Sequence, residues 1–418
     1  MAADKFLITN WCGVPHCFIR HEDGSLAVDR LEQVKRAGLN LLAVYDHGYE
    51  TNCEVLAACE KLGLKVSLIE DRIRHAIGHP ENRRELVEAA VRDYSQYPAL
   101  FEYHLTDEPN SGAFPSLGAV TRLIEELDPA HEAYINLFPN YATPEMLGNP
   151  TYYDHLDEYM QVVNPPILSY DHYNFHKGEP IEDHVIEDDR ERGIYEVAYR
   201  KIESPGFFNN IEDAYAITKK YNKPLMIIVL VTEHGPYRNL TEAEIRWEVF
   251  NTLCYGIKRL CYFTYWTPGA DHDEGDAIWH WKNAMITKDG HETAHYEQIA
   301  RINKELSAVG NILLPYKVKE VYHLGREHDD KIRYWPGAYG DITEMNSDRA
   351  LVGLYEQGYV MIANKNFNDP TVLTFSTVPG KRVMLYDKVS GIWSKMEAVD
   401  GVYTINLAAG DGELIKID

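Results

Sequence analysis

The sequence predicts a (β/α)8 TIM barrel followed by a C-terminal antiparallel β-sandwich domain. In about the first 310 residues, short apolar runs alternate with helical patterns, which is typical of βαβ units around a parallel sheet. Eight strands and eight helical patterns can be counted there. This number fits a closed barrel better than the alternative, an open doubly wound sheet. After Pro315 the helical patterns stop, and alternating runs separated by turn residues follow.

The first four predicted strands are short and apolar, and a helical pattern follows each of them. Gly38 and Gly63 stand directly after two of these helices, where glycine adopts the left-handed conformation that ends many α-helices. The predicted strands cover residues 6–10, 39–45, 64–69 and 100–105, and the predicted helices cover residues 27–37, 52–62, 82–94 and 117–127.

The second half of the predicted barrel continues the alternation less regularly. Thr241 and Glu244 form a Thr-x-x-Glu capping box, which marks the start of a helix that ends at Gly256. An acidic segment over residues 174–192 is too long for a plain connection, so it is either a functional insertion or a solvated loop. The remaining predicted strands cover residues 133–137, 167–170, 224–231 and 260–265. A less regular region over residues 153–160 precedes the sixth strand, and further helices cover residues 195–221, either unbroken or broken near Pro205-Gly206, and residues 291–309.

We therefore expect two domains, a barrel over residues 1–315 and a β-sandwich over residues 316–418. The second domain contains alternating runs such as residues 359–363, 371–375 and 382–386, and these are separated by Asn-Asp-Pro and Pro-Gly turns. Three aromatic residues of this domain allow either a carbohydrate-binding patch or ordinary core packing: Tyr386, Trp393 and Tyr403.

The composition excludes several classes of partner. The formal net charge is −24, which disfavours nucleic acid and anionic membranes, because both require a basic surface. It also disfavours a polyanionic substrate, although a local basic pocket could override the overall charge. No glycine-rich phosphate loop is present, so nucleotide chemistry is not expected, and we expect no cofactor.

Targeting signals and cysteines say little about the function of the protein. No run approaches the roughly 18 apolar residues of a membrane-spanning helix. The first residues lack the apolar region of a signal peptide, so we expect a cytoplasmic protein, or a secreted or periplasmic one whose signal has been removed. The six cysteines match no zinc pattern. Cys12 and Cys17 flank a short turn and are either a disulfide or two thiols.

The ends of the predicted strands carry acids, aromatic rings and histidines. In a parallel barrel, all carboxyl ends of the strands open on one face, where ligands bind. Carboxylates bond to sugar hydroxyl groups, and aromatic faces stack on the C–H face of a pyranose. We therefore predict a carbohydrate substrate, bound by Trp11, Tyr45, Asp46, Glu70, Asp107, Asn136, Asp171, Tyr173, His234 and Trp266. Trp279 and Trp281 could line a further subsite.

Two glutamates at these ends are candidates for catalysis. Glu108 follows the fourth predicted strand, and Glu233 follows the seventh. Hydrolysis of a glycoside requires one acid to protonate the leaving oxygen and a second group to attack the sugar or to activate water. The acid must keep its proton near neutral pH, and crowding with Asp107 in one barrel mouth could raise its pKa. The two glutamates are therefore the predicted catalytic pair.

These residues resemble a known superfamily. Trp11, the Asp107-Glu108-Pro109 step, Glu233 and the segment 262–268 are together similar to the clan A glycoside hydrolases. The resemblance covers the layout of the barrel rather than a long motif, and it assigns no single family. It implies a glycosidase that cleaves an O-glycosidic bond in a neutral oligo- or polysaccharide without a metal.

The resemblance also implies roles for individual residues. Glu108 would be the acid/base and Glu233 the nucleophile of a retaining mechanism, with the two carboxyl groups about 5–5.5 Å apart. Tyr173 would support the nucleophile, and Trp266 would form the floor of the sugar subsite. Asp107 stands where this superfamily usually has asparagine. This departure could make Asp107 the proton donor, or could change the mechanism to inverting.

Two other functions fit parts of the sequence. A barrel without catalysis could bind oligosaccharides through Trp11, Tyr173 and Trp266. A metal-dependent sugar hydrolase or isomerase could use the histidines near the barrel mouth, which are His47, His104, His172 and His234. An acidic loop around His272 could bind calcium, but a solvated loop is the simpler interpretation because the spacing of a calcium loop is missing.

Overall fold

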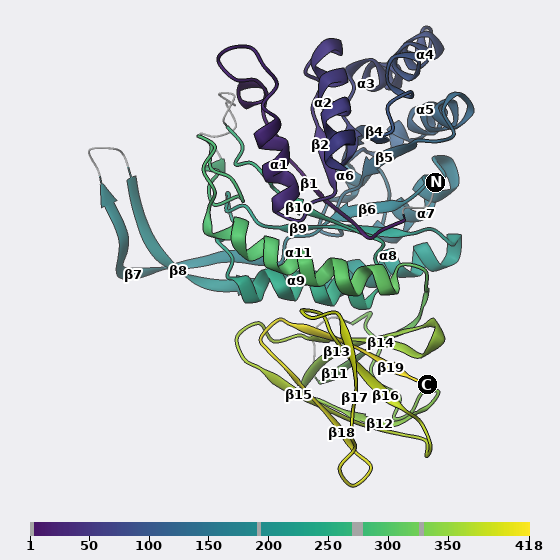
Figure 1. Ribbon diagram of the computed structural model, residues 1–418, viewed down its shortest axis with the longest axis vertical. Coiled ribbons are helices and arrows are strands. Elements are labelled where there is room, and N and C mark those ends of the chain that lie inside the picture. The colour runs from purple at the N-terminus through teal and green to yellow at the C-terminus, as the bar shows by residue number, and fades with distance from the viewer. Residues whose placement is uncertain (1–3, 190–193, 270–278, 326–329) are drawn as a thin grey trace.

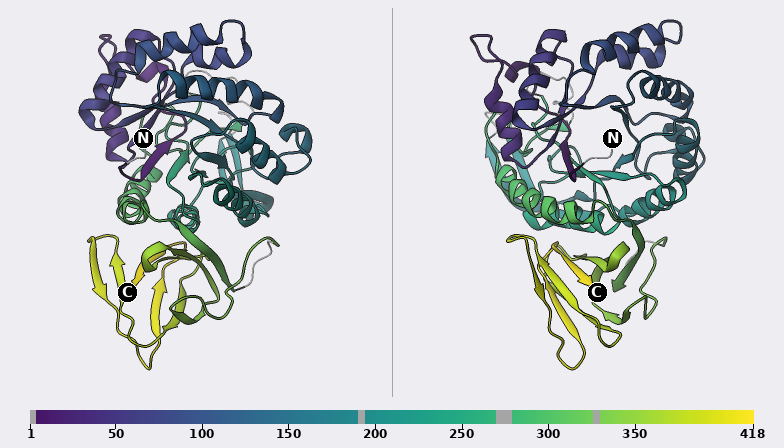
Figure 2. Two further views of the ribbon diagram at one scale, coloured as in Figure 1. Left: turned by 90° about the vertical axis from the view of Figure 1, so that its right-hand side faces the viewer. Right: turned by 45° about the vertical axis from the view of Figure 1, so that its right-hand side comes forward.

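The computed structural model describes residues 4–189, 194–269, 279–325 and 330–418. Figure 1 shows a barrel of strands and helices that packs on a smaller β-domain, and the two views of Figure 2 show the barrel from other sides. None of the helices in these ranges is long and apolar enough to span a membrane.

Within the described residues, eight parallel strands form the barrel, as predicted. They build two four-stranded halves, in the orders β1-β10-β9-β6 and β2-β3-β4-β5. Backbone hydrogen bonds close the ring, because Asn40 N donates to Ile8 O (3.0 Å) and Leu137 N donates to Ser169 O (3.0 Å). The strands are β1 (Leu7–Asn10), β2 (Leu41–Val44), β3 (Lys65–Leu68), β4 (Leu100–Asp107), β5 (Glu132–Asn136), β6 (Leu168–Asp171), β9 (Leu225–Leu230) and β10 (Arg259–Phe263).

Helices cover the outside of the barrel (Figure 2). The predicted capping box is confirmed, because the Thr241 side chain accepts from Glu244 N while the Glu244 side chain accepts from Thr241 N. Gly63 ends α2 at φ 72°. The helices are α1 (Val28–Arg36), α2 (Tyr49–Leu62), α3 (Asp71–Gly78), α4 (Arg83–Tyr94), α5 (Phe114–Leu127), α6 (Pro144–Leu147), α7 (Tyr152–Val162), α8 (Phe207–Tyr221), α9 (Glu242–Cys254) and α11 (Ala294–Leu313).

An ion cluster fills the amino-terminal end of the barrel. Arg259, the first residue of β10, donates to Glu102 Oε2 (2.7 Å) and to Glu132 Oε2 (2.5 Å). The guanidinium group also lies over the ring of Phe101, at 4.6 Å from its centre. Because Arg259 and Glu102 are buried, each charge depends on its partner for stabilisation.

The prediction of one helix over residues 195–221 is wrong in its first half. Residues 194–203 form β8 (Ile194–Glu203), which pairs with β7 (Phe175–Asp189), and α8 begins only at Phe207. The predicted acidic insertion is thus one strand of a long hairpin that projects from the barrel (Figure 1). Tyr195, Val197 and Tyr199 alternate with a period of two, which is the pattern of a strand.

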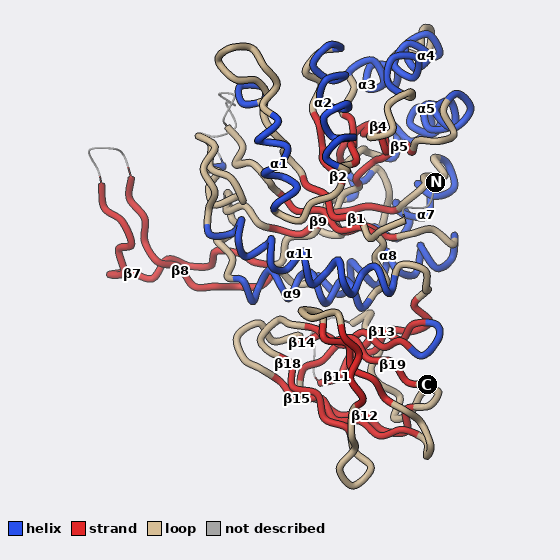
Figure 3. Tube along the Cα trace, in the orientation of Figure 1, coloured by secondary structure: helices blue, strands red, loops and turns tan. Residues whose placement is uncertain are grey.

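In the described part of the C-terminal region, nine strands form the β-sandwich, and they are drawn in red in Figure 3. One sheet has the order β11-β13-β14-β19-β16-β17 and the other has the order β12-β15-β18. Apolar residues from both sheets form the core, with Val352, Ile362 and Phe375 among them. The strands are β11 (Val318–Gly325), β12 (Ile342–Asn346), β13 (Arg349–Tyr355), β14 (Tyr359–Asn364), β15 (Thr371–Thr377), β16 (Val383–Asp387), β17 (Ile392–Lys395), β18 (Tyr403–Leu407) and β19 (Gly412–Ile417).

The structure decides two alternatives that the sequence left open. Tyr403 stacks on Phe375 (ring centres 5.1 Å apart), and Tyr386 is buried against Trp393 (5.0 Å). These contacts favour core packing over a carbohydrate-binding patch. All six cysteines lie in the described part of the chain, and none of them forms a disulfide, so Cys12 and Cys17 are not joined to each other.

A buried acid of α9 leads to a first prediction. Glu248 is fully buried, and within the described residues it has no ion-pair partner, so burial raises its pKa well above the ordinary value. The folded protein keeps a proton that the unfolded chain releases, and stability therefore falls as pH rises above the unfolded pKa. Glu248→Gln is expected to raise the melting temperature by roughly 1–3 °C at pH 8 and to leave it unchanged at pH 4. Equal effects at both pH values in thermal unfolding would contradict this.

Candidate active site

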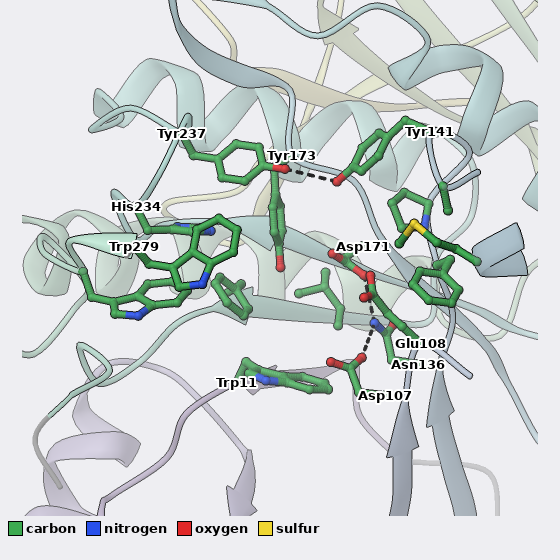
Figure 4. Close-up of a pocket in the computed structure, with 17 residues that line it drawn as sticks. Trp11, Asp107, Glu108, Asn136, Tyr141, Asp171, Tyr173, His234, Tyr237 and Trp279 are labelled. Atoms are coloured by element: carbon green, nitrogen blue, oxygen red, sulfur yellow. Dashed lines mark hydrogen bonds between the residues drawn. The ribbon is translucent and has the colours of Figure 1, made fainter. Parts of the chain in front are cut away.

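A cavity of about 330 Å3 opens at the carboxyl ends of the barrel strands (Figure 4). Seven of the twelve predicted site residues line it: Trp11, Asp107, Glu108, Asn136, Asp171, Tyr173 and His234. The sequence also suggested Trp279 and Trp281, which line it too. The other lining residues are Phe138, Pro139, Tyr141, Ala142, Met146, Ile228, Tyr237 and Phe263.

Three acids and one amide form one wall of this cavity. Asn136 at the end of β5 donates from Nδ2 to Asp107 Oδ1 (3.1 Å) and to Asp171 Oδ1 (2.9 Å), so it joins the ends of β4 and β6. The carboxyl group of Glu108 lies against that of Asp171, close enough for a hydrogen bond (Figure 4). Two carboxyl groups in this position repel each other unless one of them is protonated.

The pKa values of the acids follow from this crowding. Burial raises the pKa of Glu108 well above the usual value, and the charges of Asp171 and Asp107 raise it further. Burial and the charge of Asp107 raise the pKa of Asp171 as well. Burial also raises the pKa of Asp107, which Asn136 partly opposes. Glu108 and Asp171 therefore share one proton at a pH where ordinary carboxyl groups are ionised.

The backbone at Glu108 is in an unusual conformation. Its φ is 43°, in the left-handed region that residues other than glycine seldom adopt. Glu108 N donates to Asn136 O (2.9 Å) and Pro109 follows directly. Strain of this kind persists where the surrounding structure holds it, and it is concentrated at functional sites. The turn directs the Glu108 side chain into the cavity (Figure 4).

Aromatic rings form the opposite wall. His234 stacks on Trp281 (ring centres 4.3 Å apart, 24° between planes), and Tyr173 meets Tyr237 edge to face (5.1 Å). The hydroxyl groups of Tyr237 and Tyr141 are 3.3 Å apart (Figure 4). This wall offers apolar ring faces with a few hydrogen-bonding groups at their edges, which suits a sugar ring.

Tyr141 and Tyr237 are cavity residues that the sequence did not predict. Tyr141 belongs to the segment between β5 and α6, and Tyr237 belongs to the segment between β9 and α9. Neither stands at a strand end, where the site residues of a parallel barrel are expected. The only sequence feature that could have indicated them is the presence of tyrosines in the connections that follow β5 and β9. This feature is not specific, because the chain contains 29 tyrosines.

Glu233 follows β9, three residues after that strand ends. It is not among the residues that line the cavity. Its buried carboxylate forms an ion pair with Lys177 at the base of the hairpin (Nζ to Oε1, 2.9 Å) and accepts from Asn283 Nδ2 (2.8 Å). The predicted pairing of Glu108 and Glu233 across one mouth therefore stays a prediction. The acids that do converge with Glu108 are Asp107 and Asp171.

Four predicted binding residues also lie outside the main cavity. Tyr45 lines a smaller neighbouring chamber of about 130 Å3, which shares Trp11 and Asp107 with the main one. Asp46 accepts from Gly48 N (2.8 Å) and from Asp71 N (3.2 Å), and Glu70 caps α3 at Ile73 N (2.9 Å). The remaining one is Trp266, which is buried and packs on Phe18 (4.8 Å) rather than forming a floor for the sugar.

The histidines near the mouth do not form a common cluster. His47 bonds a second histidine (2.9 Å between ring nitrogens), and His172 bonds an asparagine of α8 (3.0 Å). His104 packs against the Trp11 ring (4.9 Å). Among the described residues, no group of three or more His, Cys, Asp or Glu side chains could hold a metal ion. The acidic loop over residues 271–276 lies outside those residues.

Comparisons with solved structures identify the fold. A protein described as a glycoside hydrolase matches with a TM-score of 0.56 and 13% identity, over 99% of this chain and 92% of the other. A glycoside hydrolase of family 5 from Bacteroides vulgatus matches with a TM-score of 0.57 and 10% identity, over 99% and 89% of the two chains. A β-galactosidase from Marinomonas ef1 matches with a TM-score of 0.52 and 11% identity, over 74% and 61%.

At these identities, the likeness shows a shared fold. The chain has the barrel fold of the clan A glycoside hydrolases, as the sequence resemblance predicted, together with a C-terminal antiparallel β-domain. No protein-family model matches the sequence, and no curated protein matches it.

Proposed function

We propose that this protein is a glycoside hydrolase that cleaves an O-glycosidic bond in a neutral oligo- or polysaccharide. The observation that carries the proposal is the Glu108–Asp171 pair, which retains a proton above the ordinary carboxyl range and faces a wall of aromatic rings. A protonated acid beside a sugar-sized aromatic site is what cleavage of a glycoside requires. The shared barrel fold is consistent with this function.

We assign the acid role to Glu108. It would donate its proton to the glycosidic oxygen as the C–O bond breaks, and the electron pair of that bond would remain on the departing hydroxyl group. Asp107 lines the same cavity and accepts from Asn136 Nδ2 (3.1 Å). Burial raises the pKa of Asp107, and the hydrogen bond from Asn136 opposes that shift. Asp107 would be the ionised carboxylate that stabilises positive charge on the sugar or activates water.

The retaining mechanism expected from the sequence pairs Glu108 with Glu233. The Glu233 carboxylate forms an ion pair with Lys177 (2.9 Å) and does not line the cavity. A mechanism through Asp107 uses acids that line the cavity already. NMR observation of the first anomer released distinguishes retention from inversion.

The direct test is a screen of neutral aryl glycosides and oligosaccharides for release of reducing sugar, with binding measured in parallel. We expect turnover by the wild-type protein on at least one neutral sugar. Binding of sugars with no release by any of them would favour the alternative of a sugar-binding barrel. Activity that disappears with a chelator and returns with added metal would favour the metal-dependent alternative.

Asp171→Asn is expected to change the pH dependence of kcat/KM. The charge of Asp171 raises the pKa of Glu108. Without that charge the pKa of Glu108 falls, so the acid form is lost at a lower pH and the alkaline limb of the profile moves to lower pH. Asp400→Asn, a surface change in the β-sandwich, is the matched control and should leave the profile in place. An alkaline limb that does not move in Asp171→Asn would show that the two groups are not coupled.

A further inference from the structure

A second cavity, of about 560 Å3, lies at the amino-terminal ends of β9 and β10, away from the acid-lined cavity. Both domains contribute to it, because the end of α8 and the turns before β9 and β10 face the start of β11. The charged side chains that line it are five lysines and one acid, namely Lys219, Lys223, Lys258, Lys317, Lys319 and Glu356. This balance is the reverse of the net charge of −24 for the whole chain.

Within the described residues, two of the five ammonium groups bond neutral partners alone. Lys258 donates to three backbone carbonyl groups at the end of α11 (2.6–3.2 Å), and Lys317 donates to Asn222 Oδ1 (2.6 Å). In the part of the chain that the structure describes, Lys219 alone of the five has a carboxylate partner, Glu320 at 3.4 Å. The positive charge of the cavity is therefore largely uncompensated.

Burial disfavours the charged form of two of these lysines. Burial and the charge of Lys317 together lower the pKa of Lys258 to about 8, although the charge of Glu356 acts in the opposite direction. Burial also lowers the pKa of Lys223, although Glu125 acts in the opposite direction. By contrast, ion pairs with two acids hold the pKa of Lys388 above its usual value. An anion in the cavity would supply the compensation that the protein itself does not provide.

We infer that this cavity binds a sugar-sized anion that carries a phosphate or sulfate ester. Lysine is a common ligand for such tetrahedral oxyanions, which it meets as a point charge. The volume lies in the range of about 300–1,000 Å3 that small organic ligands occupy. The rings of Tyr215 and Tyr255 and the side chains of Leu225 and Val318 also line the cavity and offer apolar contacts to a sugar.

Lys223 and Lys319 are the residues to change, because no hydrogen bond or ion pair of either ammonium group occurs among the described residues. The double variant Lys223→Gln/Lys319→Gln removes two positive charges from the cavity and leaves the bonds of Lys258 to α11 intact. Lys61→Gln/Lys304→Gln makes the same change in net charge at exposed positions of α2 and α11. The two double variants are therefore matched in charge and differ in location.

Isothermal titration calorimetry of the full chain at constant ionic strength tests the inference. The probes are glucose 6-phosphate, glucose 6-sulfate, inorganic phosphate and glucose. We expect one of the two esters to bind with 1:1 stoichiometry and glucose to give no signal. The cavity variant should bind that ester at least tenfold more weakly, whereas the surface variant should stay within twofold of wild type. Binding should weaken from pH 7 to pH 9, because Lys258 loses its proton in that range.

Each contrary result is decisive. Failure of both esters to bind the wild-type protein overturns the inference, as does equal loss of affinity in the two double variants. If inorganic phosphate binds as tightly as the esters, the sugar part of the ligand adds no affinity. That result would overturn the inference of a site for a sugar-sized anion. The cavity is separate from the Glu108 wall, so these outcomes do not depend on whether the protein hydrolyses glycosides.

Discussion

Glu108→Gln is expected to lower kcat on an unactivated oligosaccharide by about 10²–10⁴-fold, the usual contribution of a general acid. Glutamine keeps the shape of the side chain and cannot donate the proton. A dinitrophenyl glycoside has a leaving group that needs no protonation, so the loss on that substrate should be clearly smaller. Steady-state kinetics on both substrates measures the two losses, and equal losses would argue against an acid role for Glu108.

Glu233→Gln is the matched comparison. Its carboxylate bonds Lys177 and Asn283 outside the cavity lining, and we expect this variant to lose less than about tenfold in kcat. It should instead loosen the base of the β7–β8 hairpin, which limited proteolysis can detect. A loss as large as that of Glu108→Gln would show that Glu233 enters the cavity in the substrate complex, as the sequence pattern first suggested.

Arg259→Met is expected to destabilise the barrel by about 3–5 kcal/mol, because it leaves the buried carboxylate of Glu102 without its partner. Methionine keeps much of the volume and the contact with Phe101, so the loss would report charge rather than packing. Chemical denaturation followed by tryptophan fluorescence measures the change at neutral pH.

The double variant Arg259→Met/Glu102→Leu provides the control. Replacing a buried ion pair by apolar residues often costs little or is stabilising, so most of the loss should be recovered. If the double variant is no more stable than Arg259→Met, the isolated charge of Glu102 is not the cause of the destabilisation.

The barrel could be predicted from sequence because each of its elements carries local signals. The run of apolar residues in β9 and the capping box at Thr241 specify a strand and a helix start from a few neighbouring residues. The hairpin strand β8 could not be recognised in the same way. Its alternation with a period of two covers only one short stretch, so the sequence predicts a helix that is continuous with α8.

The acid-lined wall could also be predicted, because Asp107, Asn136 and Asp171 end their strands. The partners of the Glu233 carboxylate could not be predicted from the sequence. Strand spacing predicts that a residue stands near the mouth, but the direction of its side chain depends on what lies beside it. Lys177 is 56 positions away in the sequence, and no local pattern indicates that it meets this carboxylate.

The two walls of the cavity come from different kinds of segment. Strand ends hold the acids in place, whereas Tyr141 and Tyr237 belong to the connections that follow β5 and β9. Connections tolerate substitution far better than barrel strands do. Directed evolution confined to these two segments could therefore retune which sugars are accepted while leaving the proton donor untouched.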